Sequence, residues 1–216
     1  MELANRESRT FHHVAWKVIT VGLLLRYLLL SRFIDCGSFI AEGAGLLESN
    51  DIHRWFDWLE HEQSPTCIFG FGESMGAAQI LQSLQGESRF CGVAAESAFS
   101  NFQEIAYDRI GQFFKAGPWL GRTILRPVVE AAFGCVTLKY WLNLKLVSPQ
   151  RIASITRVPI LLIHSRNESN IPIRHSHRIA ETSSTVALWE VPDTDHCGAI
   201  QHRTRRVRAA SRSLVR

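Results

Sequence analysis

The sequence has few cysteines, and no two of them are close enough in the chain to form a CxxC motif. Their number is odd, and most stand in apolar runs: Cys36, Cys67, Cys91, Cys135 and Cys197. Because structural zinc sites and disulfide frameworks need paired cysteines, we expect neither of them here. Buried or incidental thiols are the interpretation that fits this pattern.

The body of the chain has no excess of basic residues over acidic ones. The formal net charge is +4 over 216 residues, but the stretch from Arg203 to Arg216 holds six arginines and no acidic residue. Since the rest of the chain is then slightly acidic, we predict no nucleic-acid-binding surface in it and no nucleic-acid partner. The basic tail, residues 201–216, is expected to be solvated, and contact with an anionic lipid or nucleic acid is the alternative.

Long apolar runs without charge are absent as well. The one membrane candidate is Val14 to Leu30, and Lys17 and Arg26 interrupt it. A charge at the centre of a bilayer costs about 2.5–3.5 kcal/mol on insertion scales, and no clear cleavage site for a signal peptide follows. We interpret the segment either as a buried strand or helix or as a membrane anchor. The predicted location is cytoplasmic, or membrane-associated through this segment.

The length of the chain suits one α/β domain with a sizeable core. Neither internal repeats nor a low-complexity linker divide it. We predict an atypical N-terminal segment at residues 1–48, which is a strand or a membrane anchor. An α/β core at residues 49–200 follows, with a helical insertion at about residues 100–147, and the basic tail at residues 201–216 ends the chain.

A helix is expected at the start of the core. The stretch NDIHRWFDWLEHE repeats apolar side chains at i, i+3, i+4 and i+7, which predicts a helix with one buried face. These side chains are Ile52, Trp55, Phe56 and Leu59. Asn50 or Asp51 is the expected N-cap.

Four short apolar runs have the character of buried strands: TCIFGF, FCGVAAES, VPILLIH and TVALWEV. Helical stretches such as MGAAQILQSLQG and RHSHRIAET alternate with them, which predicts a mostly parallel sheet with helices on both faces. Residues 99–146 break this alternation with aromatic-rich helical sequence, which forms either a small cap or plain helix packing. In a cap, Phe113, Phe114, Trp119 and Trp141 would line an apolar pocket.

The first of these strands leads into a G-x-S-x-G motif, Gly72 to Gly76, which a helix follows. This is the pattern of a nucleophile elbow. Glycine is expected two residues before and two residues after the serine, because side chains there would clash with neighbouring backbone. Ser74 is then the candidate nucleophile. The backbone N–H of Met75, at the N-terminus of the helix, is the candidate oxyanion donor.

A base and an acid are expected in the loops after the last two strands. His196 lies in VPDTDHCGA, after the last strand, and would take the Ser74 proton and return it to the leaving group. Glu168 is the only carboxylate in SRNESNIP, after the preceding strand, and would orient the imidazole. Asp193 and Asp195 are the alternatives, but their closeness to His196 in the chain makes it harder for them to reach its ring.

Two other pairs of histidines could suggest a metal: His12 with His13, and His175 with His177. No acidic residue or cysteine stands at ligand spacing from them. We therefore predict surface histidines and no metal site.

The chain order Ser74, Glu168, His196 resembles that of the α/β-hydrolase superfamily. The resemblance is closest to the serine aminopeptidase and prolyl-oligopeptidase-like hydrolases. The matching sequences are GFGESMGA, VPILLIH…NESNIPIRHS and VPDTDHCGA, and they cover roughly residues 45–199. The resemblance implies an α/β-hydrolase fold with a small helical cap. It also implies a serine hydrolase that cleaves an ester or peptide bond of a small substrate without a cofactor.

The sequence departs from this superfamily in front of the first predicted helix. Residues 1–49 leave room for at most one of the usual N-terminal strands, and no His-Gly or Gly-Gly supplies the second oxyanion donor there. The competing hypothesis is therefore an impaired or truncated hydrolase-fold protein that acts as a scaffold, anchored to a membrane through the N-terminal apolar segment. The retained order of serine, acid and histidine favours the enzyme, with reduced activity as one outcome.

Overall fold

The computed structural model describes residues 48–192 and 194–199. The helices are α2 (Glu48–Gln63), α3 (Met75–Ser83), α4 (Phe102–Phe113), α5 (Trp119–Arg122), α6 (Arg126–Tyr140), η2 (Leu144–Leu146), α7 (Pro149–Ile155) and α8 (Arg174–Ala180). The strands are β1 (Ile68–Glu73), β2 (Phe90–Glu96), β3 (Ile160–Ser165) and β4 (Val186–Val191). Strands and helices therefore alternate as the sequence predicts, with a longer helical insertion between β2 and β3.

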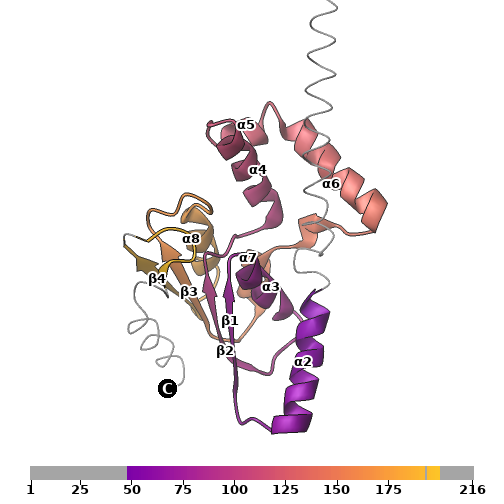
Figure 1. Cartoon of the computed structure of the whole chain (residues 1–216), viewed down its shortest axis with the longest axis vertical. Coiled ribbons are helices and arrows are strands. Elements are labelled where there is room, and N and C mark those ends of the chain that lie inside the picture. Colours follow the sequence, from indigo (N-terminus) through magenta and orange to yellow (C-terminus); the bar gives the residue numbers. More distant parts are fainter. Residues whose placement is uncertain (1–47, 193, 200–216) are drawn as a thin grey trace, which may run out of the picture. The chain divides into compact units, whose positions relative to one another are not determined.

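The four strands form one parallel sheet in the order β1-β2-β3-β4. Glu73 at the end of β1 is in register with Glu96 at the end of β2, and Ser165 at the end of β3 is in register with Val191 at the end of β4. The carboxyl ends of all four strands consequently share one edge. The loops that follow them begin side by side, although they lie far apart in the sequence (Figure 1).

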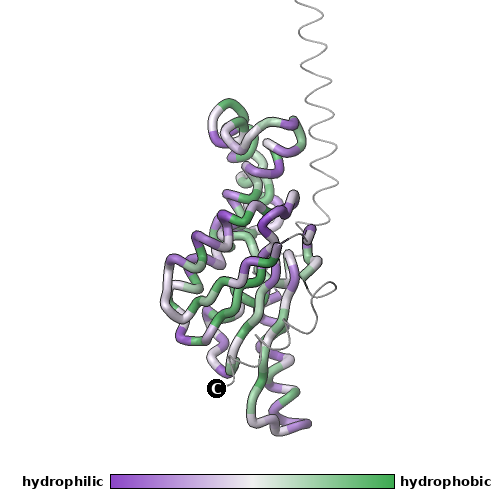
Figure 2. Tube along the Cα trace, turned by 90° about the vertical axis from the view of Figure 1, so that its left-hand side faces the viewer, coloured by the Kyte–Doolittle hydropathy of each residue, from purple (hydrophilic) through white to green (hydrophobic). Residues whose placement is uncertain are grey.

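The main core lies on one face of this sheet. Figure 2 shows that apolar residues concentrate along the strands, whereas polar residues are frequent in the helices. On β1, glycines face α3, and a Cβ on Gly70 would lie 2.4 Å from the Ile80 side chain. Phe69 and Phe71 alternate with these glycines and are 44% and 46% exposed. The buried core residues on the covered face come from α2, α3, α7, α8 and the strands, among them Phe56, Leu81, Phe90, Ile152, Leu162 and Ile179.

The opposite face of the sheet carries a smaller apolar cluster. Its buried members are Ala94, Leu161, Ile163, Val191 and Ala199, and Trp189 packs against them. Because β3 contributes to both clusters, each of its six residues is buried. This explains why its sequence is a continuous apolar run and does not alternate.

The insertion between β2 and β3 contains helices and no strand among its described residues, as predicted. Helices α4, α5 and α6 lie together beyond the carboxyl edge of the sheet, and we call them the cap (Figure 1). The two ends of the insertion meet at what we call the neck. There the N–H of Phe102 donates to the Val147 carbonyl (3.0 Å), and the N–H of Gln150 donates to the Ser100 carbonyl (2.9 Å).

The aromatic residues expected to line a pocket of the cap are exposed. Phe113 is 70% exposed, Phe114 42%, Trp119 55% and Trp141 91%. Trp141 ends α6 in the left-handed conformation, with φ 57°, which turns the chain away from the helix. The described residues therefore do not enclose a pocket lined by Trp141.

Two details of α2 differ from the prediction. The helix is already formed at Glu48, before the expected N-caps. Of the predicted buried face, Phe56 is 3% exposed, but Trp55 is 60% exposed and stacks edge-to-face with Trp58. Ile52 packs against the core and Leu59 is half-buried, so Trp55 alone departs from the predicted buried face.

The prediction that no cysteines pair is wrong. Cys67, just before β1, forms a disulfide with Cys91 in β2, and their Cα atoms are 5.8 Å apart. The two strands are neighbours in the sheet, and their pairing begins with Ile68 opposite Phe90. The register of the sheet therefore brings together two thiols that are 24 residues apart in the chain.

No helix within the described ranges is both long enough and apolar enough to cross a membrane. The apolar stretch Val14–Leu30 and the basic tail at residues 201–216 lie outside the described residues. Their roles stay predictions.

Candidate active site

Ser74 occupies the tight turn between β1 and α3. Its backbone has φ 52° and ψ −114°, a conformation that residues other than glycine rarely adopt. Its N–H donates to the carbonyl oxygen of Glu96 at the end of β2, at 2.8 Å. Gly72 permits the tight turn, because a Cβ there would lie 2.4 Å from the carbonyl oxygen of Gly76. The turn therefore places the Ser74 hydroxyl at the carboxyl edge of the sheet.

The predicted reason for the second glycine of the motif, Gly76, was a clash between a side chain there and neighbouring backbone. That reason is wrong. A Cβ on Gly76 would meet no atom within 4 Å. The crowding lies on the strand side of the turn, at Gly72, and the backbone of Gly76 is the surface that a larger residue at Gly72 would strike.

His196 joins the serine to the carboxylate that sequence order predicts. Its Nε2 lies 2.9 Å from the Oγ of Ser74, and its Nδ1 lies 2.5 Å from the Oε1 of Glu168. With the proton on Nδ1, the ring donates to Glu168, and Nε2 is free to accept the hydroxyl proton of Ser74. The three predicted residues thus form one continuous hydrogen-bonded chain, although 122 residues separate Ser74 from His196.

Glu168 is buried and is held by several donors. The hydroxyl of Ser97 donates to its Oε2 at 2.6 Å, and the N–H of Ile171 donates to its Oε1 at 3.0 Å. Oε1 therefore accepts from both Ile171 and His196, which fixes the direction of the carboxylate. No sequence pattern points to Ser97, which follows β2 with φ 54° and contacts a residue 71 positions later.

His164, near the end of β3, contacts the carboxylate of Glu168 as well. It is fully buried, and its Nε2 lies 3.2 Å from the Oε2 of Glu168 and 2.8 Å from the Ile171 carbonyl oxygen. Its Nδ1 lies 2.7 Å from the Oγ of Ser176. Burial lowers the pKa of His164, and the nearby charge of Glu168 opposes this effect without reversing it. A neutral His164 with its proton on Nε2 satisfies all three contacts.

Of the two alternative acids, Asp195 does not take the place of Glu168. Asp193 lies outside the described residues. The Oδ1 of Asp195 accepts from the backbone N–H of His196 at 2.8 Å and from the hydroxyl of Ser169 at 3.3 Å, so its carboxylate shapes the loop and does not meet the imidazole. The bond from the His196 backbone lowers the pKa of Asp195 and keeps it ionised.

Met75 is the first residue of α3 and follows Ser74 directly. Backbone N–H groups in the first turn of a helix have no partner inside the helix and point toward its positive end. A donor next to the nucleophile is therefore available for an oxyanion. A second donor would be expected in residues 1–49, which lie almost wholly outside the described residues.

A second buried carboxyl group, Glu96, lies beneath the site and was not predicted. It is 2% exposed at the end of β2, and its Oε1 accepts the N–H of Ala199 at 2.8 Å. Burial raises its pKa, the backbone bond from Ala199 acts against this rise, and the charges of Glu73 and Glu168 add to it. Its Oε2 has no hydrogen-bond partner among the described residues. Glu96 therefore anchors the loop that carries His196.

Cys197 follows the candidate base but is not a competing nucleophile. Burial raises the pKa of its thiol to about 11, and the carboxylates of Glu96, Glu73 and Glu168 add to the rise. At neutral pH the sulfur is a protonated thiol, which is a poor nucleophile.

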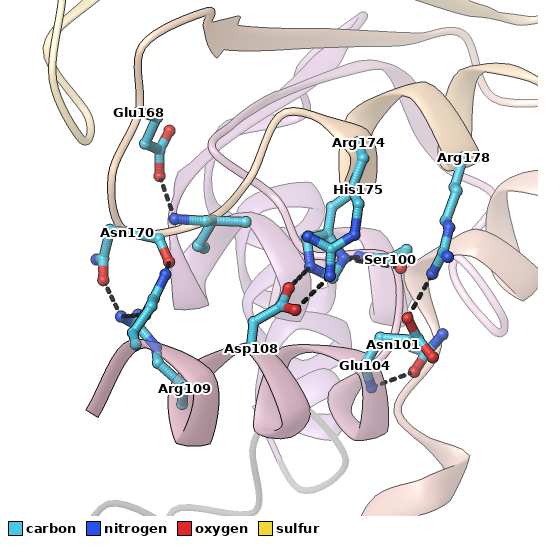
Figure 3. Close-up of polar contacts among 12 residues, drawn as sticks. Ser100, Asn101, Glu104, Asp108, Arg109, Glu168, Asn170, Arg174, His175 and Arg178 are labelled. Carbon is cyan, nitrogen blue, oxygen red and sulfur yellow. Dashed lines mark hydrogen bonds and ion pairs between the residues drawn. The ribbon is translucent and has the colours of Figure 1, made fainter. Parts of the chain in front are cut away.

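His175, predicted to be a surface histidine, is fully buried between α8 and α4 (Figure 3). Its Nδ1 accepts the N–H of Ser100 at 3.1 Å, so its Nε2 carries the proton and donates to Asp108 at 2.7 Å. Burial raises the pKa of Asp108, but the bonds from His175 and Arg174 outweigh it and leave the pKa below its usual value. The ionised carboxylate of Asp108 therefore links the cap helix α4 to α8 through hydrogen bonds.

Within the ranges that the structure describes, no group of three or more histidine, cysteine, aspartate or glutamate side chains could hold a metal ion. His12 and His13 lie outside those ranges. His177 is partly exposed, and its Nε2 lies 3.0 Å from Glu190.

The chain matches no family by sequence profile. It is 27% identical over 165 residues to the uncharacterized protein YfhR of Escherichia coli O157:H7, a match that covers 74% of this chain and 49% of that protein. The chain therefore spans about half the length of the curated relative it matches.

Three solved structures with hydrolytic names share its architecture. The esterase Pf2001 of Pyrococcus furiosus has a TM-score of 0.57 and 18% identity, covering 80% of this chain and 62% of the esterase. An acylaminoacyl peptidase of Pyrococcus horikoshii has a TM-score of 0.58 and 21% identity, covering 80% of this chain and 28% of the peptidase. A puromycin hydrolase has a TM-score of 0.57 and 16% identity, covering 79% of this chain and 25% of that enzyme.

These likenesses show the fold. The four-stranded parallel sheet, the flanking helices and the turn after β1 are those of an α/β-hydrolase, as predicted. The chain covers less than two thirds of the length of each of these solved chains.

Proposed function

We propose that this chain of α/β-hydrolase fold is a serine hydrolase that cleaves an ester or amide bond through an acyl-enzyme on Ser74. The observation that carries the proposal is the hydrogen-bonded chain from Ser74 through His196 to the buried carboxylate of Glu168. The esterase and peptidase names of its structural neighbours support the same reaction class. The proposed substrate is a small ester or peptide, and no cofactor takes part.

In the proposed reaction, the Oγ of Ser74 attacks the substrate carbonyl carbon while the Nε2 of His196 takes the hydroxyl proton. Glu168 stabilises the resulting imidazolium and holds the ring in place. The carbonyl oxygen becomes an oxyanion next to the N–H of Met75. The intermediate then collapses, and His196 gives its proton to the departing alcohol or amine, which leaves an acyl ester on Ser74.

The second half of the reaction repeats these roles with water. His196 takes a proton from water as the water oxygen attacks the acyl carbon, and it returns that proton to the Oγ of Ser74 as the carboxylic acid leaves. The strained backbone of Ser74 suits this cycle because it holds the hydroxyl at the tip of the turn, next to His196.

Labelling with a fluorophosphonate probe tests the proposal on the full chain. Wild type is expected to be labelled, and Ser74→Ala is expected to lose all labelling and all ester hydrolysis. Ser154→Ala, which removes an exposed hydroxyl on α7, is the matched control and should label like wild type. Circular dichroism should show all three to be equally folded.

Absence of labelling in folded wild type would reject the hydrolase mechanism. The competing hypothesis, a non-catalytic scaffold on the hydrolase fold, would then replace it. Hydrolysis that persists in Ser74→Ala would likewise exclude an acyl-enzyme on this serine.

A further inference from the structure

The cap helix α4 contacts the loop that carries Glu168. The side-chain amide of Gln112 donates to the carbonyl oxygens of Ser169 (2.9 Å) and Asn170 (3.0 Å). The Nη1 of Arg109 donates to the side-chain oxygen of Asn170 and, at 3.2 Å, to that of Gln112. Figure 3 shows Arg109 extending from α4 toward Asn170, with Glu168 on the same loop. A guanidinium group therefore lies beside the loop of the candidate acid.

Arg109 forms no ion pair with a described carboxylate, whereas two arginines near it do. Arg174 pairs with Asp108, and Arg178 pairs with Glu104 at 2.6 Å. In contrast, both hydrogen-bond partners of Arg109 are neutral amides, and no described carboxylate lies within ion-pair distance of it. Both of these bonds use Nη1, so Nε and Nη2 have no acceptor among the described residues. A planar guanidinium fork with free N–H groups is suited to a carboxylate.

The position of Arg109 is exposed but electrostatically close to the site. Partial burial lowers the pKa of Arg109, and the charges of Glu168 and Asp108 oppose this effect, so the arginine and the triad carboxylate influence each other. An arginine stays protonated in proteins, so this is a fixed positive charge. On the same loop, Ser169 contacts Asp195, which is next to His196 in the chain. Arg109 thus lies at the rim of the candidate active site.

We propose that Arg109 binds a free carboxylate of the substrate, so that the site prefers esters or amides that carry a negative charge near the scissile bond. The inference rests on the proposed hydrolase function and names the substrate class for that site. Substrate binding would supply the planar anion that the described residues do not place against the free edge of the guanidinium.

Arg109 also contacts Asn170, so a purely structural role has to be separated from anion binding. If Arg109 only positioned the loop of Glu168, its loss would lower kcat for every substrate. If it binds a substrate carboxylate, its loss raises KM for charged substrates and leaves neutral ones nearly unaffected. Arg109→Gln keeps a side chain that can donate to Asn170 and removes the charge. Arg109→Lys keeps the charge and removes the fork.

The experiment compares the 4-nitrophenyl esters of butyrate and of succinate (the hemiester). These esters have acyl groups of the same chain length and differ in a terminal carboxylate. The acetate esters of methyl 4-hydroxybenzoate and of 4-hydroxybenzoate place a comparable difference on the leaving group. We expect wild type to prefer the charged member of at least one pair. We expect Arg109→Gln to lose about 10- to 100-fold in kcat/KM on that member alone, in the range of a charge-assisted hydrogen bond.

Two further variants sharpen the result. Arg109→Lys should keep part of the preference, and added salt should weaken the preference in wild type. Lys115→Gln, which removes an exposed charge just after α4, is the control and should keep the preference of wild type. Equal losses on charged and neutral esters in Arg109→Gln would overturn carboxylate binding in favour of loop positioning. Wild type that hydrolyses neutral esters without any preference for charged ones would also overturn it. Wild type that neither hydrolyses any ester nor reacts with fluorophosphonate would reject the proposed function itself.

Discussion

Replacing Glu168 with glutamine is expected to slow turnover without inverting the tautomer of the base. The Oε1 of Glu168 accepts from both the Ile171 N–H and the Nδ1 of His196. An amide NH2 in that position would face the Ile171 N–H as one donor against another, so the glutamine is expected to place its oxygen there. Its NH2 group then faces the hydroxyl of Ser97, which can also accept, and the Nε2–H of His164, which keeps the Ile171 carbonyl oxygen as its acceptor. His196 keeps its proton on Nδ1 and can still accept the proton of Ser74.

What the glutamine removes is the negative charge opposite the imidazolium. Two unit charges about 4 Å apart interact by about 4 kcal/mol at an effective dielectric constant near 20, and about 1.4 kcal/mol is a factor of ten in rate. Because a neutral hydrogen bond remains, we expect kcat to fall by about 10²–10³-fold. A substitution that forces the wrong tautomer costs about 10⁴-fold in serine proteases, so the size of the loss tells the two cases apart.

The assay is the steady-state hydrolysis of a 4-nitrophenyl ester, with active sites counted by fluorophosphonate titration. Glu190→Gln is the matched control: this carboxylate on β4 pairs with Arg166 and His177 at the surface and does not contact the triad. A loss in Glu168→Gln beyond about 10⁴-fold would show that the amide is inverted and that Ile171 does not select its orientation. Activity within about threefold of wild type would show that Glu168 does not assist His196 at all.

Three further outcomes are expected. Glu96→Gln should raise the free energy of unfolding at pH 8 and change it little at pH 4. Burial raises the pKa of Glu96 in the folded state, so stability is lost as pH rises through that pKa. Urea titrations that give the same difference between variant and wild type at both pH values would contradict this. Asp108→Asn should lower the free energy of unfolding by about 1–3 kcal/mol, since His175 loses a charged acceptor inside the protein. An unchanged denaturation midpoint would show that the bond between Asp108 and His175 does not hold the cap helix. Iodoacetamide at pH 8 should label Cys135, which is exposed, and leave Cys197 unlabelled, because burial raises the pKa of its thiol to about 11. Equal labelling of the two cysteines in peptide mass mapping would refute the burial of Cys197.

The closeness of Ser74, Glu168 and His196 could be predicted because each follows a strand with a clear apolar pattern. The carboxyl ends of parallel strands share an edge, so loops after different strands meet there without any knowledge of side-chain contacts. Sequence order then separated Glu168 from Asp195, whose carboxylate meets the backbone of its own loop. The catalytic roles of the three residues stay predictions until they are tested.

The contacts around the triad could not be predicted because they depend on packing between distant segments. Ser97 reaches Glu168 across 71 positions, and Asp108 meets His175 across 67. Neither pair shares a motif or a helical spacing that periodicity could reveal. The disulfide between Cys67 and Cys91 was missed for a related reason, since it requires the register of two strands and not only their existence.

The neck of the cap has a consequence for how this fold acquires new specificities. Two backbone hydrogen bonds close the insertion where it leaves the sheet, between Phe102 and Val147 and between Ser100 and Gln150. A different cap grafted at these points would leave every strand of the sheet in place. Such a graft would nevertheless have to replace the bonds from Gln112 to the loop of Glu168. Exchange of cap helices is therefore less constrained in α5 and α6 than in α4, which contacts the loop of the candidate acid.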